Sequence, residues 1–367
     1  MNMNQSRLTP DEWRETARLV SLDEADFPAG RHAFHREELM NFIDQDTRSA
    51  ASATTPTPAP TAPARRRGFM RPLIVIPAAA CSLAVIAAGV VTLTGSSSGN
   101  ESLVAGPALT AQVGAGTAQG VPQLLNQISL AAAKKPAPTV RAGQYIYIES
   151  QVGTTYEKTV DDKTTVVSDG IHRRQTWRST DGAKGWLIDP AVFPPGGGTI
   201  DHINEKGEIE PARLGGPSYD YLATLTTDPD TLLAKIYKET KGQGNSPDQQ
   251  AFTTIGDLLN ESMPPADLNV ALFRTATKIP GVVLVKDAVD AAGRHGVAVA
   301  RLDETSGART EWIFDAKSYT YLGERTIQVR PHGGDSGKIK PGTILYTSAI
   351  TARQAVDEMK QVPSSAA

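Results

Sequence analysis

The sequence predicts an α+β fold: a curved antiparallel sheet covered by helices, joined to a single transmembrane helix and a short helical segment in the cytoplasm. Three observations predict this arrangement. Residues 73–93 form an uncharged apolar run. Residues 144–188 and 282–351 alternate with the period of β-strands, and residues 219–275 between them have helical periodicity.

The run from Leu73 to Leu93 is long enough to cross the hydrocarbon core of a bilayer as a helix. Four arginines lie within 65–71, whereas the first basic residue after the run is Lys134. Because an excess of Lys and Arg stays in the cytoplasm, we expect a cell-membrane protein with a cytoplasmic N-terminus and an extracytoplasmic C-terminus. A cleavable signal peptide is the alternative, but such peptides begin within the first few residues of a chain.

The composition argues against nucleic-acid binding and against disulfides in the outer region. The 367 residues carry a formal net charge of -3, and only the arginines before the membrane segment cluster. Binding to phosphates needs a clustered basic face, so no nucleic-acid partner is expected. Cys81 is the only cysteine and lies within the apolar run, so the outer region must be held by its own core.

Changes in composition divide the chain into six parts. A Pro/Thr/Ala-rich stretch cannot form a core, and a Gly/Ser/Ala-rich stretch after the membrane segment is typical of a flexible connection. The expected parts are a cytoplasmic helical segment (1–49), a linker (50–64), a basic juxtamembrane segment (65–71), a transmembrane helix (72–94), a flexible stalk (95–120) and an extracytoplasmic α+β domain (121–367).

The cytoplasmic segment is expected to contain two short amphipathic helices, Pro10 to Val20 and Pro28 to Ile43. Helices of this length bury little alone, so they need each other or a cytoplasmic partner protein. His32 and His35 could suggest zinc, but a tetrahedral site needs more ligands than this pair supplies. We therefore expect no metal and no cofactor.

The outer domain is expected to begin with a helix from Val121 to Lys135, followed by an antiparallel meander. Asp169-Gly170 and Asp181-Gly182 have the composition of tight turns between neighbouring strands. Trp177 and Trp186 flank the second turn, where tryptophans usually pack across strands. The expected strands begin at Gln144 and continue over 164–168, 171–179 and 185–188.

Helices are expected next, and then a second set of strands. Asp228 and Pro229 suit the N-cap and first position of a helix that buries Leu232 and Leu233. The later helices, around 252–259 and 268–275, would cover one face of the sheet with it. The remaining strands are expected over 282–289, 297–302, 310–314, 319–328 and 343–351. Trp312 and Phe314 share a strand face that should meet Leu232, Leu233 and Leu272.

Four stretches together resemble an uncharacterised family of actinobacterial single-pass membrane proteins, many of them encoded beside extracytoplasmic-function sigma factors. The stretches are TDPDTLL, ALFRTATKIPGV, GRHGVAV and WIFDAKSYTYLGER, and the resemblance covers most of 123–328. It implies an anti-sigma or signal-relay role and no catalytic residue. The chain departs from better-known anti-sigma proteins because it lacks their His/Cys zinc motif.

One short motif raises the possibility of an enzyme. Gly334 to Gly337 (GDSG) matches the signature around the nucleophile of chymotrypsin-like proteases. Those enzymes also need a general-base His and an orienting Asp earlier in the chain, and neither His202 nor His295 has the sequence setting typical of that base. We expect no catalytic residue, no cofactor-binding residue and no metal ligand.

The sequence therefore predicts a non-enzymatic membrane-anchored protein with an extracytoplasmic binding or sensor domain, and a role like that of anti-sigma proteins. The expected partners are the bilayer through Leu73 to Leu93, a cytoplasmic sigma factor and an unidentified extracytoplasmic ligand. The alternative is a membrane-tethered carrier of lipids or hydrophobic ligands, because a curved sheet capped by helices resembles lipoprotein carriers and could enclose an apolar cavity.

Overall fold

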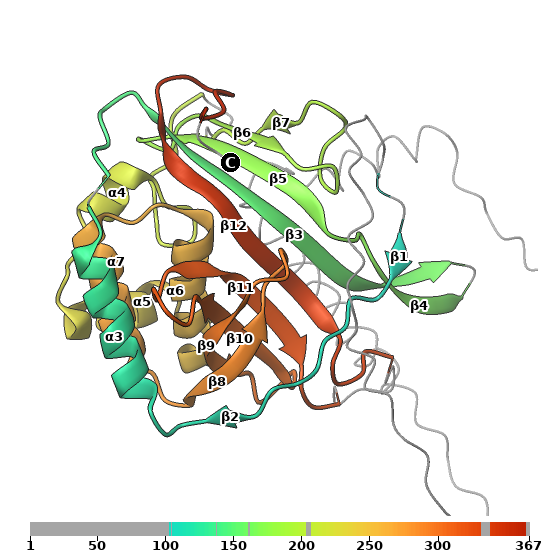
Figure 1. The fold of residues 1–367 in the computed structure, drawn as a ribbon. Coiled ribbons are helices and arrows are strands. Elements are labelled where there is room, and N and C mark those ends of the chain that lie inside the picture. Colours follow the sequence, from blue (N-terminus) through green and yellow to red (C-terminus); the bar gives the residue numbers. More distant parts are fainter. Residues whose placement is uncertain are drawn as a thin grey trace, which may run out of the picture. The chain divides into compact units, whose positions relative to one another are not determined.

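The computed structural model describes residues 103, 105–136, 138–160, 162–202, 207–331 and 338–364 (Figure 1). The expected cytoplasmic segment, linker, basic segment and transmembrane helix lie outside these residues, as does the GDSG motif. Within the described ranges, no helix combines the length and the apolar character needed to cross a bilayer.

The described strands form one twelve-stranded sheet in which neighbouring strands run antiparallel. Its order is β2-β8-β9-β10-β11-β12-β3-β5-β6-β7, with β4 beside β3 and β1 beside β4. With the helices described below, this sheet confirms the predicted α+β class. The strands are β1 (Gly106–Pro107), β2 (Gly116–Thr117), β3 (Tyr145–Val160), β4 (Lys163–Ser168), β5 (His172–Ser179), β6 (Gly185–Ile188), β7 (Gly198–Thr199), β8 (Val282–Val289), β9 (His295–Leu302), β10 (Ala308–Phe314), β11 (Tyr321–Gln328) and β12 (Ile344–Val356).

The centre of the sheet is the pairing of β12 with β3, which joins the two strand-rich parts of the sequence (Figure 1). The register runs from Val356 opposite Tyr145 to Tyr346 opposite Thr154, with one irregularity between Ile350 and Ala352. The last strand of the chain therefore lies beside the first long one, and the sheet continues on both sides of this pair.

The role predicted for Asp169-Gly170 is wrong. These residues do not join two neighbouring strands, because β4 and β5 both pair with β3, one after the other along the same strand. The register advances by one residue between the pairs Thr155–Ser168 and Val152–His172, as at a β-bulge. Gly170 has a φ of 71°. A sixteen-residue strand is long enough for two successive partners, which a local turn motif cannot reveal.

Five helices are described, and their N-termini follow local sequence rules. Asp228 caps α5 by accepting a hydrogen bond from the Thr231 N–H at 2.9 Å, as predicted, and Ser246 caps α6 through the Gln249 N–H at 3.1 Å. A proline follows each cap, where its missing N–H costs no helical bond. The helices are α3 (Val121–Lys134), α4 (Tyr219–Ala223), α5 (Pro229–Glu239), α6 (Pro247–Glu261) and α7 (Ala266–Ala276).

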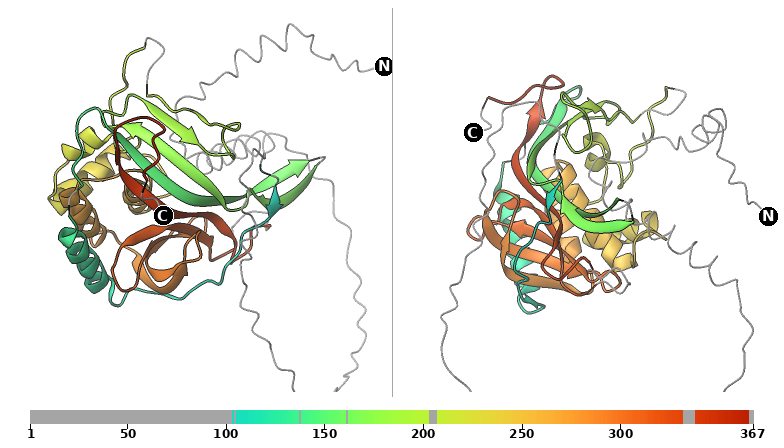
Figure 2. Two further views of the ribbon diagram at one scale, coloured as in Figure 1. Left: turned by 45° about the horizontal axis from the view of Figure 1, so that its top comes forward. Right: turned by 90° about the vertical axis from the view of Figure 1, so that its right-hand side faces the viewer.

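The main core lies between these helices and strands β8 to β10 (Figure 2). Trp312 stacks on Phe252 of α6 with ring centroids 3.9 Å apart and an angle of 5° between the planes. Phe314 meets the edge of Phe273 at 5.6 Å. The same cluster contains Leu232, Leu233 and Leu272, which confirms the predicted meeting of strand aromatics and helical leucines.

The segment 105–120, expected as part of a flexible stalk, is instead part of the folded body. Gly106 and Pro107 pair with β4, and Gly116 and Thr117 pair with β8. Backbone bonds do not require an apolar side-chain pattern, and small residues allow close approach. A Cβ at Gly114 would lie 2.8 Å from Val285 Cγ1. The composition that suggested a stalk therefore also suits a strap that lies close against the sheet.

The face of the sheet away from the helices is also covered. Glu311 is fully buried and accepts hydrogen bonds from Arg309 and Arg325, while Arg309 also donates to the Gly114 carbonyl of the strap at 2.9 Å. Trp177 lies opposite Trp186 and is buried, as expected for cross-strand packing. Its indole N–H donates to the Gln361 carbonyl at 2.7 Å, so the C-terminal segment completes this face.

Candidate functional site

The helix-facing side of the sheet changes in character from one end to the other. Over β8, β9 and β10 it carries the aromatic and aliphatic side chains of the main core, and we refer to this part as the apolar half. Over β12, β3 and β5 it carries Arg353, Ser348, Arg174 and Arg178, with Asp189 from the residue after β6 beside Arg174, and we refer to this part as the polar half. The C-terminal end of α6 lies over the polar half, because Arg353 donates to the Leu259 carbonyl at 2.5 Å.

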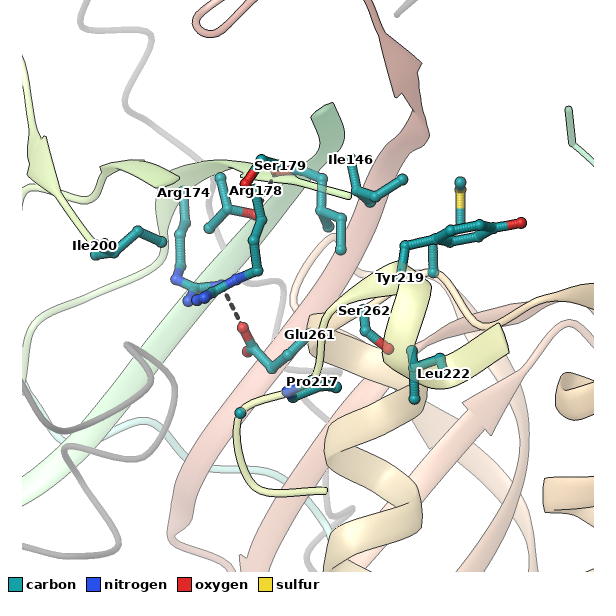
Figure 3. A pocket seen from close by; sticks show the side chains of 14 residues that line it. Ile146, Arg174, Arg178, Ser179, Ile200, Pro217, Tyr219, Leu222, Glu261 and Ser262 are labelled. Atoms are coloured by element: carbon teal, nitrogen blue, oxygen red, sulfur yellow. Dashed lines mark hydrogen bonds and ion pairs between the residues drawn. The ribbon is translucent and has the colours of Figure 1, made fainter. Parts of the chain in front are cut away.

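The polar half contains an open pocket (Figure 3). The space in it that the centres of water-sized molecules can occupy is about 50 Å³, and the pocket opens to solvent. Its floor is formed by β3 and β5, and its walls by the end of α6 and the residues after it, by helix α4, and by the loop between β7 and α4. Apolar side chains form most of the lining, namely Ile146, Ile148, Ile200, Pro217, Tyr219, Leu222 and Met263, together with Arg174, Arg178, Glu261 and a few small polar residues.

Arg174 is held in place by two carboxylates. Its guanidinium lies 3.0 Å from Glu261 of α6 and 3.5 Å from Asp189, and its side chain is only 7% exposed. Burial alone would lower the pKa of Arg174, but the negative groups around it, Glu261 first, outweigh burial and raise it. Arg174 is thus a buried and paired cation, and its role in the pocket is to fix Glu261 and the end of α6 over the sheet.

Arg178 lies beside Arg174 but is not paired. Figure 3 shows the two arginine side chains running together toward Glu261, with the interaction drawn only from one of them. No hydrogen bond or ion pair joins Arg178 to any residue that the structure describes. Burial, and the neighbouring charge of Arg174, lower the pKa of Arg178 to about 10, although Glu261 and Asp201 act in the opposite direction. Arg178 therefore remains charged at neutral pH, with unused donors that face the pocket.

The end of α6 is held by hydrogen bonds to the sheet. Asn260 accepts a hydrogen bond from the Ser348 hydroxyl at 2.8 Å and lies 3.1 Å from the Tyr346 hydroxyl. The Ser262 hydroxyl donates to the Leu258 carbonyl at 2.6 Å. These contacts fix the position of Glu261, so the pocket wall that carries it is formed before any ligand binds.

His172 and Asp189 form a second charged contact behind Arg174. The His172 Nε2 lies 3.0 Å from Asp189, and its Nδ1 lies 3.2 Å from the Gly170 carbonyl. Burial lowers the pKa of His172, but Asp189 more than offsets this, so the pKa is raised. Both ring nitrogens are engaged, which leaves this histidine without the free nitrogen that a general base needs. The pocket group that is suited to binding an anion is the guanidinium of Arg178.

The sequence did not identify this site. Along β5, the helix-facing positions are His172, Arg174, Thr176 and Arg178, and the opposite face carries Trp177. Alternation of this kind normally places the aromatic residue in the core and the arginines in solvent. Here Trp177 is buried, and the arginine face is covered as well, because the residues after Gly185 and the end of α6 lie over it. That packing is set by contacts distant in sequence. His295, dismissed as a catalytic base, is exposed and lies 2.8 Å from Asp287.

Comparison with known proteins gives little further information. The chain matches no known sequence family and no characterised protein in sequence searches. A search of solved structures finds the MucA/MucB complex of Pseudomonas aeruginosa (11% identity, TM-score 0.22, 67% of this chain and 59% of that one) and a second structure of MucB with MucA(peri) (12% identity, TM-score 0.20, 66% and 60%). The chain thus covers about three fifths of each. At these scores the similarity carries no inference about what this chain binds.

Proposed function

We propose that residues 105–364 form an extracytoplasmic ligand-binding domain of a single-pass membrane protein, which relays occupancy of its pocket to a cytoplasmic partner, a sigma factor. The observation that carries the binding part is Arg178, an unpaired guanidinium in a pocket with mostly apolar walls. Arg178 is half-buried, so its N–H groups remain accessible from the pocket, and a guanidinium without a protein partner can donate them to an oxyanion of a ligand.

The membrane and relay parts of the proposal are supported by the sequence. The apolar run of 73–93 and the arginines before it would place the pocket outside the cytoplasm and the residues before 65 inside. The resemblance to a family encoded beside extracytoplasmic-function sigma factors supports the choice of partner. The sequence of the two stretches before residue 44 predicts amphipathic helices, whose apolar faces would suit contact with such a partner.

The groups in the pocket favour binding over catalysis. In the lining, Arg174 and Glu261 neutralise each other. His172, which lies behind Arg174, has both ring nitrogens engaged. A hydrolytic mechanism that uses a side-chain nucleophile requires a base beside that nucleophile. The residues that line the pocket do not form such a pair. We therefore propose a non-enzymatic role.

The alternative of a lipid carrier requires a large apolar cavity under the helices. Instead, the apolar half is filled by the main core, in which Leu125, Leu232, Phe252, Ile255 and Trp312 are each fully buried. The pocket in the polar half is open and carries charges. No observation in the described residues favours transport of long acyl chains over binding of a smaller ligand.

Two measurements test this proposal. An enzyme reporter that is active only outside the cytoplasm, fused after Ala367, should be active, and the same reporter fused at Met1 should be silent. Immobilised residues 1–64 should retain a sigma factor of the source organism, and a version with Phe34 and Leu39 changed to Asp should not. Inverted reporter activity would contradict the topology, and equal retention by the two versions would contradict the relay.

A further inference from the structure

The pocket allows its ligand to be described more closely than as an unspecified molecule. This step rests on the proposed binding function and concerns the chemistry of the ligand alone. Three features of the pocket define that chemistry: the donors of Arg178, the charge balance around them, and the distribution of apolar side chains.

The free donors of Arg178 favour an oxyanion. A guanidinium is planar and presents several N–H groups in a fixed fork, which matches the two oxygens of a carboxylate. Arg174 shows this preference within the same pocket, because it already binds the Glu261 carboxylate at 3.0 Å. Arg178 lies four residues after Arg174 on the same strand and faces the same side of the sheet. It lacks an equivalent partner among the described residues.

The charges favour a ligand with one negative charge. The pocket lining contains two cations, Arg174 and Arg178, and one anion, Glu261. Behind the lining, Asp189 is paired with His172 and also lies 3.5 Å from Arg174. Asp201 accepts a hydrogen bond from the Gly185 N–H at 2.8 Å. One added negative charge balances the lining, whereas a second would be repelled by Glu261 in a partly desolvated space.

The apolar walls favour a short hydrocarbon segment on the ligand. Ile146 and Ile148 on β3 and Met263 after α6 pack together in one small apolar cluster, and all three line the pocket. Ile200 and Leu222 lie on the other walls. Each methylene group of a ligand that leaves water against such a wall favours binding. A chain of a few carbons would therefore add to the affinity given by the charged group.

From these features we infer that the pocket binds a small amphipathic monocarboxylate, with its carboxylate on Arg178 and a short apolar chain against Ile146, Ile148 and Ile200. Arg178 serves as the ligand-binding cation. Arg174 acts as a positioning residue, because it holds Glu261 and the wall of α6 in place without facing the ligand with free donors.

The test is equilibrium dialysis of radiolabelled hexanoate against the full chain in nanodiscs of phosphatidylcholine, with empty nanodiscs subtracted. Wild type should bind hexanoate saturably, and 1-hexanol and hexylammonium should not compete. Arg178→Gln should weaken binding by about tenfold or more, since a hydrogen bond to a charged group is worth about 1.5–3 kcal/mol. The affinity of Arg178→Lys for hexanoate should lie between that of wild type and that of Arg178→Gln, because lysine keeps the charge but lacks the forked donors of a guanidinium.

Arg173→Gln is the matched control. Arg173 is the same residue type on the same strand but faces away from the pocket and pairs with Glu149. Its substitution should change hexanoate affinity less than about twofold. Ile200→Ser should weaken binding by about fivefold through lost apolar contact. The melting midpoint of each variant, measured by circular dichroism, separates loss of binding from loss of the fold.

Several outcomes would overturn the inference. These are an absence of saturable hexanoate binding to folded wild type, equal binding by folded Arg178→Gln, and competition by 1-hexanol as strong as that by unlabelled hexanoate. Tighter binding of hexyl phosphate than of hexanoate would refute the single-charge argument. Retention of a sigma factor by residues 1–64 does not depend on Arg178, so the ligand class can fail while the relay proposal stands.

Discussion

The apolar half and the polar half of the helix-facing sheet surface use the same architecture for different purposes. In the apolar half, Trp312 and Phe314 are fully buried against α6 and α7. In the polar half, Arg174 and Arg178 occupy the corresponding side of β5, and an open pocket separates them from α4. Filled space stabilises the fold, and unfilled space with an unpaired charge is available to a ligand. We expect substitutions in the two halves to separate stability from binding.

The largest expected loss of stability comes from a substitution in the apolar half. Phe314→Ala should lower the free energy of unfolding by about 3–5 kcal/mol, because it removes a buried ring and leaves a cavity beside Phe273 and Tyr321. Denaturant melts followed by tryptophan fluorescence measure this change. The control is Leu130→Ala on α3, where the side chain is 50% exposed and the cost should be under about 0.5 kcal/mol. Equal costs would contradict the placement of the core.

A smaller loss of stability is expected at the boundary between the halves. Gly256 lies in α6, where alanine would ordinarily stabilise a helix by about 1 kcal/mol. A Cβ there would lie 2.5 Å from both Trp312 Nε1 and Glu324 Oε2. Gly256→Ala should therefore destabilise by about 1–3 kcal/mol through overpacking. Thr253→Ala in the same helix is the control, and a stabilised Gly256→Ala variant would show that α6 lies farther from the sheet.

The third expected change is a pH-dependent loss of stability when His172 in the polar half is substituted. The pKa of His172 is raised above its ordinary value of 6.5, because Asp189 outweighs the opposing effect of burial. Despite burial, the pKa of Asp189 is lowered below 3.8 by His172. The contribution of the His172–Asp189 pair to the free energy of unfolding is therefore greatest between pH 3.8 and pH 6.5, the ordinary pKa values of the two groups. It is lost as pH rises through the raised pKa of His172, and as pH falls through the lowered pKa of Asp189.

The measurement compares wild type with His172→Gln at about pH 5.5 and about pH 9. The stability advantage of wild type should be larger at the lower pH, and smaller throughout than the cost of Phe314→Ala. His295→Gln provides the matched control, because His295 also lies 2.8 Å from a carboxylate, Asp287, but is 69% exposed. A pH-independent difference for His172→Gln would argue against a protonated His172 in the folded protein.

The smallest expected change in stability is at the proposed binding residue. Arg178→Gln removes a half-buried charge that has no described partner, so its free energy of unfolding should stay within about 0.5 kcal/mol of wild type. The same denaturant melts measure it. A loss of more than about 2 kcal/mol would mean that Arg178 stabilises the fold, and would remove the contrast between the two halves.

The sequence predicted the elements well where local rules act, and less well where distant segments meet. Capping by Asp228 and the strand alternation around Trp312 and Phe314 are local, and the structure confirms both. The continuous pairing of β4 and β5 along β3, and the strap over 105–120, depend on backbone bonds to partners far along the chain. Side-chain patterns carry little information about such pairings.

The binding pocket could not be predicted for a related physical reason. Arg174 and Arg178 would be ordinary exposed residues if β5 had one free face. They become site residues because Glu261, 87 positions after Arg174, is brought over them by α6. The signal within the sequence is limited to two arginines four residues apart on a strand whose other face already carries Trp177. That pattern becomes informative only once both faces are known to be covered.

The most direct test of the central claim is the NMR signal of the Arg178 Nε–H in the full chain in nanodiscs, assigned by its loss in Arg178→Gln and followed as hexanoate is added. A carboxylate bound by this guanidinium should shift the Arg178 signal saturably and leave that of Arg173 in place, because a charge-assisted hydrogen bond changes the environment of the donor proton. An Arg178 signal that does not move at hexanoate concentrations that saturate binding would contradict the claim that the polar half is a binding site built on this residue.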